Sequence, residues 1–294
     1  MSSETEVKML QKLDELEQRD GKLPGFIQLY RQLLRLQSEA GSQLTTLEPN
    51  LGQDVVSDRL SQGVPLLSFE DLLLDGAQVQ ALLQEIIRSV AKDTPDASKE
   101  VESLGNILSD KAALEEVVRA WYEGSSLISI ATRHSVDGEL LSLVVAAVVK
   151  PFLSAHSEVL LPKVNQESWR RRYCPICGGR PDFAYLDEER GARWLLCSRC
   201  DAEWLFQRLE CPYCGCQDQN SLVYFTDDAG LYRLYVCAQC KRYLKAIDLR
   251  QAKPEVLLPL ERLLTFEFDM QAREDGYMPC AEADTDERGE EGLS

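Results

Sequence analysis

The sequence predicts a mostly α-helical N-terminal domain, followed by two tandem small β-ribbon metal units and a C-terminal helix. Apolar residues recur at helical spacing through the N-terminal half of the chain. Cysteine pairs and short alternating runs then take over until about Arg250, and a last helical pattern follows Pro254. These changes predict a helical domain at 1–168, metal units at 169–206 and 207–250, a closing helix at 251–278, and an acidic tail at 279–294 that we expect to be disordered.

The helical domain is justified by the spacing of its apolar residues. Leu10 and Leu13 belong to the first such pattern, and Asp110 is a candidate N-cap for a later helix. Residues 41–65 contain Gly, Pro, Ser and Asp and are predicted to form a long connection, which Val64-Pro65-Leu66-Leu67 ends. The periodicity predicts helices over 1–20, 26–38, 68–92, 97–108, 110–122, 124–134 and 137–156.

Composition and charge narrow the functional classes. The 294 residues carry a net charge of −17, which repels nucleic-acid phosphates unless basic groups are locally concentrated. The longest apolar run, 140–149, is shorter than the ~20 residues of a membrane span, so we expect a buried helix and no membrane partner. The charged residues 1–20 lack the apolar core of a secretory signal, and we expect a cytoplasmic protein.

The ten cysteines indicate metal ligation, because the cytosol keeps thiols reduced and disfavours disulfides. Two segments both open with Cys-Pro-x-Cys-Gly and both close with Cys-x-x-Cys after an apolar run. Each predicted hairpin brings its two pairs together as a tetrahedral four-sulfur site, which zinc prefers and which iron occupies in rubredoxin-like sites. The candidate ligands are Cys174, Cys177, Cys197 and Cys200 in the first unit, and Cys211, Cys214, Cys237 and Cys240 in the second.

The same pattern leaves some alternatives open. Pairing within each unit is favoured, and a cross-braced arrangement is the alternative. Four thiolates leave no position for water, so we expect structural or redox-active metals rather than hydrolytic ones. Cys216 and Cys280 lie outside the repeat and are interpreted as spare thiols. The chain has no phosphate loop, nucleophile elbow or plausible triad, so we predict that it is not an enzyme.

Aromatic and basic residues beside the cysteines are candidates for a second role. Trp204 and Tyr243 follow the closing pairs, where they either cover the metal sites and join the units or, if exposed, contact a protein partner. Arg170-Arg171-Arg172 is either a solvated face or a site for phosphate or a partner. Residues 169–250 contain 13 Lys and Arg against 11 Asp and Glu, a balance of +2 that is far from a nucleic-acid surface.

The order of these motifs resembles the formate dehydrogenase accessory (maturation) proteins, the FdhE-like family. The resemblance rests on the cysteine pairs, Glu203-Trp204, Arg208, Tyr243-Leu244-Lys245 and a final Glu274-Asp275-Gly276-Tyr277, and it covers about 169–280. The sequence departs from the family at Lys241-Arg242, where Gly-Thr is expected.

The resemblance implies a cytoplasmic, non-catalytic helper that binds the catalytic subunit of formate dehydrogenase and supports its activation. It favours iron over zinc in the two sites. It also suggests Trp204, Arg208, Tyr243 and Lys245 as partner contacts. The alternatives are a zinc-ribbon nucleic-acid-binding protein and a small rubredoxin-like electron carrier, and the apolar N-terminal helices could support a homodimer.

Overall fold

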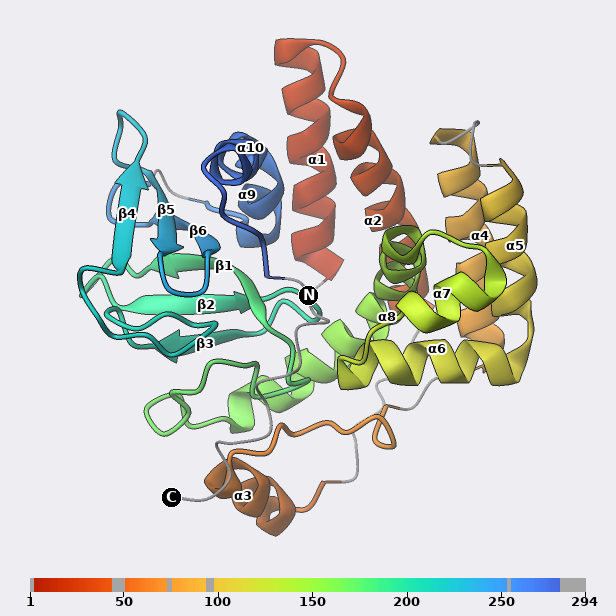
Figure 1. The fold of residues 1–294 in the computed structure, drawn as a ribbon, viewed down its shortest axis with the longest axis horizontal. Coiled ribbons are helices and arrows are strands. Elements are labelled where there is room, and N and C mark those ends of the chain that lie inside the picture. Colours follow the sequence, from red (N-terminus) through yellow and green to blue (C-terminus); the bar gives the residue numbers. More distant parts are fainter. Residues whose placement is uncertain (1–2, 44–50, 73–75, 94–97, 253–254, 281–294) are drawn as a thin grey trace. The chain divides into compact units, whose positions relative to one another are not determined.

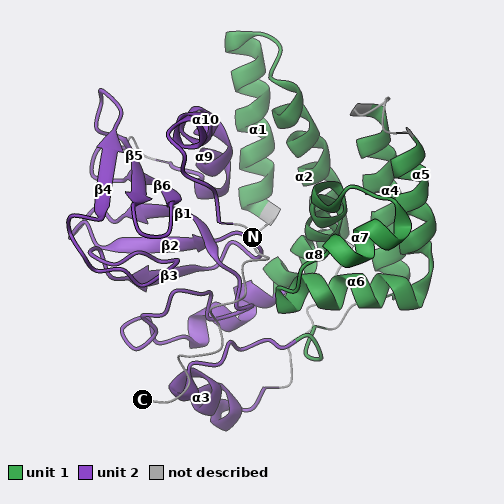
Figure 2. Cartoon of the chain, viewed as in Figure 1, with its two compact units in different colours: residues 1–47, 69–155, 281–294 green, residues 48–68, 156–280 purple. Residues whose placement is uncertain are grey.

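The computed structural model describes residues 3–43, 51–72, 76–93, 98–252 and 255–280, and the chain divides into two compact units (Figures 1 and 2). The first, called the helical unit, comprises residues 1–47, 69–155 and 281–294. The second, called the ribbon unit, comprises residues 48–68 and 156–280. The predicted tail falls almost wholly outside the described residues.

Helices that follow one another in the chain pack against their neighbours in the helical unit: α1 with α2, α2 with α4, α4 with α5 and α5 with α6. Their apolar faces supply the core, as the helical spacing predicted. Asp110 caps α6, because its carboxylate accepts the backbone N–H of Ala113 at 2.8 Å. The helices are α1 Ser3–Asp20, α2 Gly25–Gln43, α4 Gly76–Asp93, α5 Ser98–Ser109, α6 Lys111–Glu123, α7 Ile128–His134 and most of α8 Gly138–Leu160.

Helix α8 contains a proline whose backbone cost is compensated by another helix. Pro151 has no N–H to donate to the carbonyl of Ala147 one turn earlier. The buried side chain of Gln37 in α2 donates to that carbonyl instead, at 2.9 Å. In the described part of the chain, one stretch, Gly138–Lys163, is long and apolar enough to cross a membrane, and 56% of its most apolar window is buried, as in a core helix.

One mixed sheet organises the ribbon unit, with the strand order β3-β2-β1-β6-β5-β4 (Figure 1). The first metal unit forms an antiparallel three-stranded ribbon and the second forms another. The central β1–β6 pair is parallel, and its register places Phe183 opposite Lys245 and Leu186 opposite Asp248. The strands are β1 Pro181–Leu186, β2 Arg193–Cys197, β3 Glu203–Phe206, β4 Leu222–Thr226, β5 Tyr232–Cys237 and β6 Arg242–Asp248.

The closing segment forms two helices rather than the single helix predicted, α9 Leu258–Leu264 and α10 Phe266–Glu274. The interruption lies where the Nζ of Lys245 approaches the carbonyl of Arg262 at 2.7 Å and that of Thr265 at 3.4 Å. Those carbonyls are the acceptors that a continuous helix would use for its own bonds. Lys245 also contacts Asp269 at 2.6 Å, so a buried cation of β6 fixes both helices on the sheet.

Two further predictions about local structure were wrong. Residues 41–65 were predicted as a connection, but they contain helix α3, Gln53–Gln62, ended by Gly63 in a left-handed conformation. The helix predicted to start at residue 68 starts at Gly76, after a turn at 69–72. The predicted fold class is confirmed: a helical N-terminal region, ribbons with two four-cysteine clusters, and C-terminal helices. The predicted domain boundaries stay a prediction.

Candidate metal centres

The first group of four thiols is assembled from two turns of the first ribbon. Cys174 and Cys177 lie in the turn before β1, and Cys197 and Cys200 lie where the chain passes from β2 to β3. Their Sγ atoms are 3.6 Å apart for Cys174 and Cys200, and 3.5 Å apart for Cys177 and both Cys197 and Cys200. All four side chains are buried.

The second ribbon repeats this arrangement. Cys211 and Cys214 precede β4, Cys237 is the last residue of β5, and Cys240 lies in the turn between β5 and β6. The Sγ atoms of Cys211 and Cys240 are 3.7 Å apart, as are those of Cys214 and Cys237. Within each group the ligand atoms all lie within 4.8 Å of one another. The thiols therefore gather within each repeat and not in the cross-braced arrangement.

These separations fit a tetrahedral metal ion. Metal–sulfur bonds of about 2.3 Å place tetrahedral sulfurs about 3.8 Å apart, close to the distances in both groups. A disulfide would bring two sulfurs to about 2.05 Å, far below any of them. The donor set of four soft sulfurs suits zinc or iron, and it does not discriminate between the two. Each group could therefore hold one metal ion.

Backbone conformation explains why each turn presents its sulfurs to one point. Gly178 and Gly215 follow the opening pairs with φ of 71° and 73°, and their N–H groups donate to the carbonyls of Cys174 and Cys211. The closing pairs are followed by Asp201 and Lys241, which adopt φ of 55° and 56°. Lys241 thus holds the left-handed conformation at the position where the family resemblance leads us to expect glycine.

Amide groups aim at the sulfurs in both ribbons. In the first, the N–H of Ile176 donates to the Sγ of Cys174 and the N–H of Arg199 to the Sγ of Cys197, each at 3.4 Å. In the second, a hydrogen bond from Cys240 and the amides of Cys214 and Tyr213 lower the pKa of Cys211 to about 5. These donors stabilise thiolates, which are the form that binds metal.

Burial acts in the opposite direction on other thiols. It raises the pKa of Cys174 well above its usual value and that of Cys214 to about 12. Without a metal ion these side chains are therefore neutral near pH 7. Binding of a metal ion then releases protons, so the apparent affinity of both sites rises with pH.

A segment far away in the sequence covers the first group. Residues 63–67, called the cover segment, run beside the opening turn: the N–H of Leu66 donates to the carbonyl of Pro175 and that of Leu67 to the carbonyl of Ile176, both at 2.8 Å. The hydroxyl of Tyr173 donates to the carbonyl of Gly63 at 2.7 Å. The sequence signal for this segment is Val64-Pro65-Leu66-Leu67, but its contact with the cysteine turn was not predicted.

The second group is more accessible. Cys214 and Cys240 are partly exposed, whereas all four thiols of the first group are buried. The chain returns to this site near its C-terminal end, where Met278 exchanges backbone hydrogen bonds with Lys241 and Tyr243. Cys216 is buried, and its carbonyl accepts the N–H of Cys211 at 2.9 Å.

A buried arginine that sequence reasoning missed links the two ribbons. Arg193 of β2 lies over the rings of Phe206 and Tyr235, and its guanidinium donates to the carbonyls of Gln207 and Glu210. Burial lowers its pKa to about 10, so it remains a cation at neutral pH. It thereby holds the 207–210 loop that leads into the second group. An arginine in an alternating strand gave no sequence signal for this role.

The suggested partner contacts are mostly inside the protein. Trp204 is fully buried and donates its indole N–H to the carbonyl of Arg171 at 2.9 Å. Tyr243 and Lys245 are also buried, and both bind the carboxylate of Asp269. Their burial corrects the expectation that these three side chains contact a partner. Arg208 is exposed, and its partner role stays a prediction.

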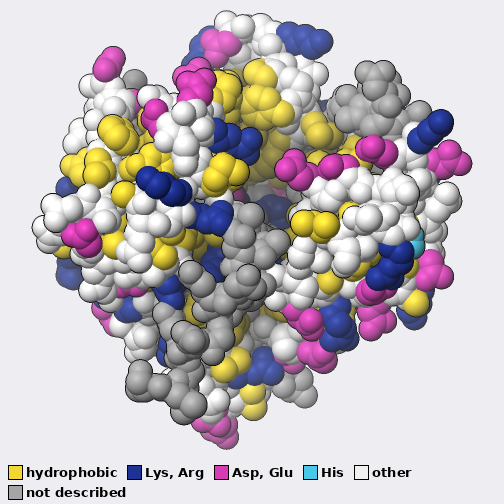
Figure 3. Space-filling view, in the orientation of Figure 1, with side chains coloured by type: hydrophobic (Ala, Val, Ile, Leu, Met, Phe, Trp, Pro, Cys, Tyr) yellow, Lys and Arg dark blue, Asp and Glu magenta, His cyan; other side chains and the backbone are white. Residues whose placement is uncertain are grey.

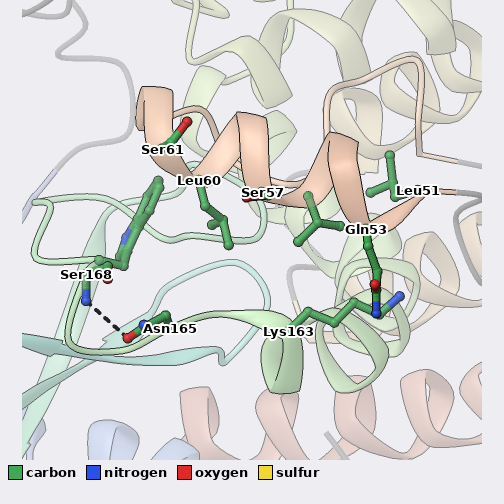
Figure 4. Close-up of a pocket in the computed structure, with 10 residues that line it drawn as sticks. Leu51, Gln53, Ser57, Leu60, Ser61, Lys163, Asn165 and Ser168 are labelled. Atoms are coloured by element: carbon green, nitrogen blue, oxygen red, sulfur yellow. Dashed lines mark hydrogen bonds between the residues drawn. The ribbon is translucent and has the colours of Figure 1, made fainter.

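The ribbon unit also contains a cavity of about 600 Å³ between α3 and the chain that follows α8 (Figure 4). Gln53 and Ser57 of α3 line one wall, and Lys163, Asn165 and Ser168 line another. The lining residues include no carboxylate, histidine or cysteine. The serine hydroxyls of this cavity therefore have no imidazole or carboxylate beside them in its lining with which to form a Ser-His-Asp arrangement.

Comparison with known proteins places these features in context. A family model described as the FdhE central domain matches residues 173–208, which contain the whole first group. A protein FdhE homolog from Aquifex aeolicus is 27% identical over 243 residues, or 81% of this chain and 80% of its own length. A protein FdhE homolog from Shewanella oneidensis is 22% identical over 263 residues, or 88% of this chain and 81% of its own.

The fold has also been observed in a crystal. The crystal structure of the FdhE protein from Pseudomonas aeruginosa matches with a TM-score of 0.61, and it covers 96% of this chain and 95% of that one. The sequence identity in this comparison is 20%, so the likeness concerns the fold alone.

Proposed function

Because the chain is an FdhE-like protein, we propose that it acts as a non-catalytic accessory protein in the maturation of formate dehydrogenase. In this role it binds the catalytic subunit of that enzyme in the cytoplasm. The observation that carries the proposal is the pair of closed four-sulfur groups in an FdhE-like fold. A site closed by four thiolates leaves no position for substrate, which suits a binding protein better than a hydrolase.

We assign one metal ion, iron or zinc, to each group, held by Cys174, Cys177, Cys197 and Cys200 and by Cys211, Cys214, Cys237 and Cys240. Such ions supply folding energy to ribbons that are too small to fold alone. Elemental analysis after anaerobic purification tests this assignment. About two equivalents of transition metal per chain are expected, and a much lower content would contradict the assignment.

The loop 207–210 is the best-supported contact for the client. It exposes Arg208, which the family resemblance selects, beside Leu209, whose side chain is 63% exposed. An arginine next to an exposed apolar side chain is typical of protein interfaces. Because Arg193 fixes the carbonyls of this loop, the two side chains project from a rigid support.

The test is capture of a formate dehydrogenase catalytic subunit by the metal-loaded protein. Wild type should retain the subunit, and Arg208→Glu should weaken retention at least about tenfold. Arg190→Glu is the matched control, because Arg190 is an exposed arginine on the hairpin of the first ribbon. If the wild type does not retain the subunit, the proposed function is wrong. If both variants lose retention equally, only the proposed contact surface is wrong.

The partial exposure of Cys214 and Cys240 favours one other function, that of a small electron carrier. A four-thiolate iron site exchanges one electron and absorbs visible light. A protein that is colourless when fully loaded with metal would exclude this alternative.

A further inference from the structure

Strand β4 is an open edge of the sheet in the ribbon unit. It terminates the strand order, and in the described parts of the chain no strand pairs with its outer side. Its sequence, Leu222–Thr226, contains no charge, and the side chains of Val223, Tyr224 and Phe225 are 45%, 51% and 52% exposed. Figure 3 shows hydrophobic side chains gathered where Figure 1 draws β4 and β5. Edges of soluble proteins normally carry charges or a covering element that prevents pairing.

The opposite edge of the same sheet has such protection. The side-chain amide of Gln166 lies along β3, where its Oε1 accepts the N–H of Leu205 at 3.2 Å and its Nε2 donates to the carbonyl of Glu203 at 3.4 Å. Trp204 and Phe206 of that strand are buried. The contrast makes β4 the edge on which a further strand can add.

The internal duplication supplies a precedent for strand addition. Asp187 after β1 and Asp227 after β4 are equivalent, because each accepts a backbone N–H from the far side of its hairpin. Strand β1 accepts β6 along its outer side. The equivalent side of β4 therefore has the geometry of a strand acceptor.

The hydrogen-bond phase of β4 shows which backbone groups are free for this purpose. The N–H of Asp227 donates to the carbonyl of Tyr232, and the N–H of Ala238 donates to the carbonyl of Ser221. Hydrogen-bonded positions alternate along an antiparallel pair, so the backbone N–H and C=O groups of Val223 and Phe225 also point toward β5. The N–H and C=O groups of Tyr224 and Thr226 and the C=O of Leu222 consequently point away from the sheet and are free, whereas the N–H of Leu222 donates to the carbonyl of Asp218 at 3.2 Å.

We propose that β4 pairs antiparallel with β4 of a second copy of this chain, in a register centred on Tyr224. Tyr224 then lies opposite Tyr224 of the second copy as a hydrogen-bonded pair, with Leu222 opposite Thr226 on either side. Roughly four backbone hydrogen bonds form: two between the Tyr224 residues, and one from each Thr226 N–H to the carbonyl of Leu222 in the other copy. The exposed Val223 and Phe225 face each other across the new pair, where apolar cross-strand contacts are favourable.

Charge is compatible with this register. The acidic hairpin tip, Asp227-Asp228, lies opposite Ser221 and Asn220 of the second copy, so no like charges stand directly opposite one another. The acidic tip of the second copy approaches the end of the sheet at which Leu222 of β4 pairs with Cys237 of β5. Cys237 in turn pairs with Arg242 of β6, so this end carries a basic residue. The ribbon segment has a balance of +2, with 13 basic and 11 acidic residues over 169–250, although the whole chain carries −17. The strongly negative charge therefore lies outside the proposed interface.

The size of the edge sets the strength of the dimer. A pairing of this length buries less than the roughly 1,200 Å² of a standard interface, so the dimer is weak and reversible. Because β3 is protected by Gln166, strands cannot add head to tail, and the assembly closes at two copies.

Sedimentation velocity of the full-length, metal-loaded protein over a concentration series tests the proposal. Wild type should shift reversibly from monomer to dimer as concentration rises. Tyr224→Lys places two cations opposite each other and should raise the dissociation constant at least about tenfold. Thr226→Pro should weaken the dimer too, because it removes a donor that points outward and leaves the β4–β5 bonds intact. Ile128→Lys, a change of an exposed apolar residue of α7, is the matched control and should leave the constant within about twofold.

Charge complementation tests the register. Val223→Lys and Phe225→Glu should each weaken self-association, and an equimolar mixture should restore a heterodimer, because these positions lie opposite each other. Metal content and circular dichroism establish that each variant is folded. A wild type that stays monomeric, with or without capture of some other strand at this edge, overturns the proposal. So does a mixture that fails to associate, or an equal effect of Ile128→Lys.

Discussion

The cover segment should control how fast a chelator removes a metal ion from the first cysteine group. Its residues reach the opening turn through three hydrogen bonds: Leu66 to Pro175, Leu67 to Ile176, and Tyr173 to Gly63. At the second group, Met278 bonds the backbone beside the closing turn and Arg172 bonds the carbonyl of Tyr213, but two of the four thiols stay partly exposed. A chelator should therefore reach the second group without displacing other structure.

The difference in the rate of metal removal follows from the hydrogen bonds of the cover segment that must break. At about 1 kcal/mol each, three hydrogen bonds cost about 3 kcal/mol, which slows access about 100-fold. Leu66 and Leu67 are buried, and exposing them would add to this cost, so 100-fold is a lower bound. Tyr173→Phe removes one bond and keeps the ring, so it should speed the slow phase about fivefold.

The assay is release of metal to a chromogenic chelator in excess, followed by time-resolved alkylation of thiols and mass spectrometry. Two phases of equal amplitude are expected, with Cys214 and Cys240 alkylated in the fast one. Tyr232→Phe is the control, because its hydroxyl bonds Glu261 and lies on neither group. A single phase, or early alkylation of Cys174, would refute the reasoning.

Four further outcomes are expected. Lys241→Gly should raise the free energy of unfolding by about 0.5 kcal/mol, because relief of its left-handed strain exceeds the entropy cost of glycine. Asp201→Gly, at the equivalent position of the first ribbon, should lower the free energy of unfolding, because the carboxylate of Asp201 pairs with Arg262 of α9. Thermal unfolding of the two metal-loaded variants measures both effects. Asp248→Asn should cost about 1–3 kcal/mol at pH 7, measured by urea unfolding. Arg250 and Arg233 lower the pKa of Asp248 to about 2, so its contribution is complete above about pH 4 and is lost as pH falls through about 2. Finally, apparent metal affinity should rise between pH 6 and 8 in a competition titration, because neutral buried thiols must release protons; a pH-independent affinity would contradict this.

The sequence could predict the parts of the fold that depend on short-range patterns. Paired cysteines around a hairpin specify a local ribbon, and the structure brings each predicted set of thiols together. Helical spacing likewise located most helices of the helical unit to within a few residues, because an amphipathic face is visible in a short window. The N-cap Asp110 could be predicted for the same reason, because a cap and the helix that follows it are neighbours in the sequence.

Long-range contacts account for what the sequence did not show. The parallel β1–β6 pair joins strands about sixty residues apart, and nothing in either strand specifies the other. Residues 63–67 contact a turn more than a hundred positions later, so their apolar side chains looked like the end of a loop. The family resemblance suggested Lys245 as a partner contact, and its burial was not foreseen because a lysine is usually exposed. Its partner, Asp269, lies in a helix 24 residues later in the chain, so no short window of sequence shows the pair.

A tandem repeat cannot give its two copies the same surroundings. When the second ribbon adds its last strand to the first strand of the first ribbon, that edge is consumed, and the corresponding edge of the second ribbon is left at the end of the sheet. The first ribbon also receives the cover segment and Gln166, whereas the second keeps two partly exposed thiols and the apolar strand β4. Sites with the same ligands thereby differ in accessibility. Metal exchange, oxidation and strand pairing should therefore concentrate on the second ribbon, while the first provides its rigid support.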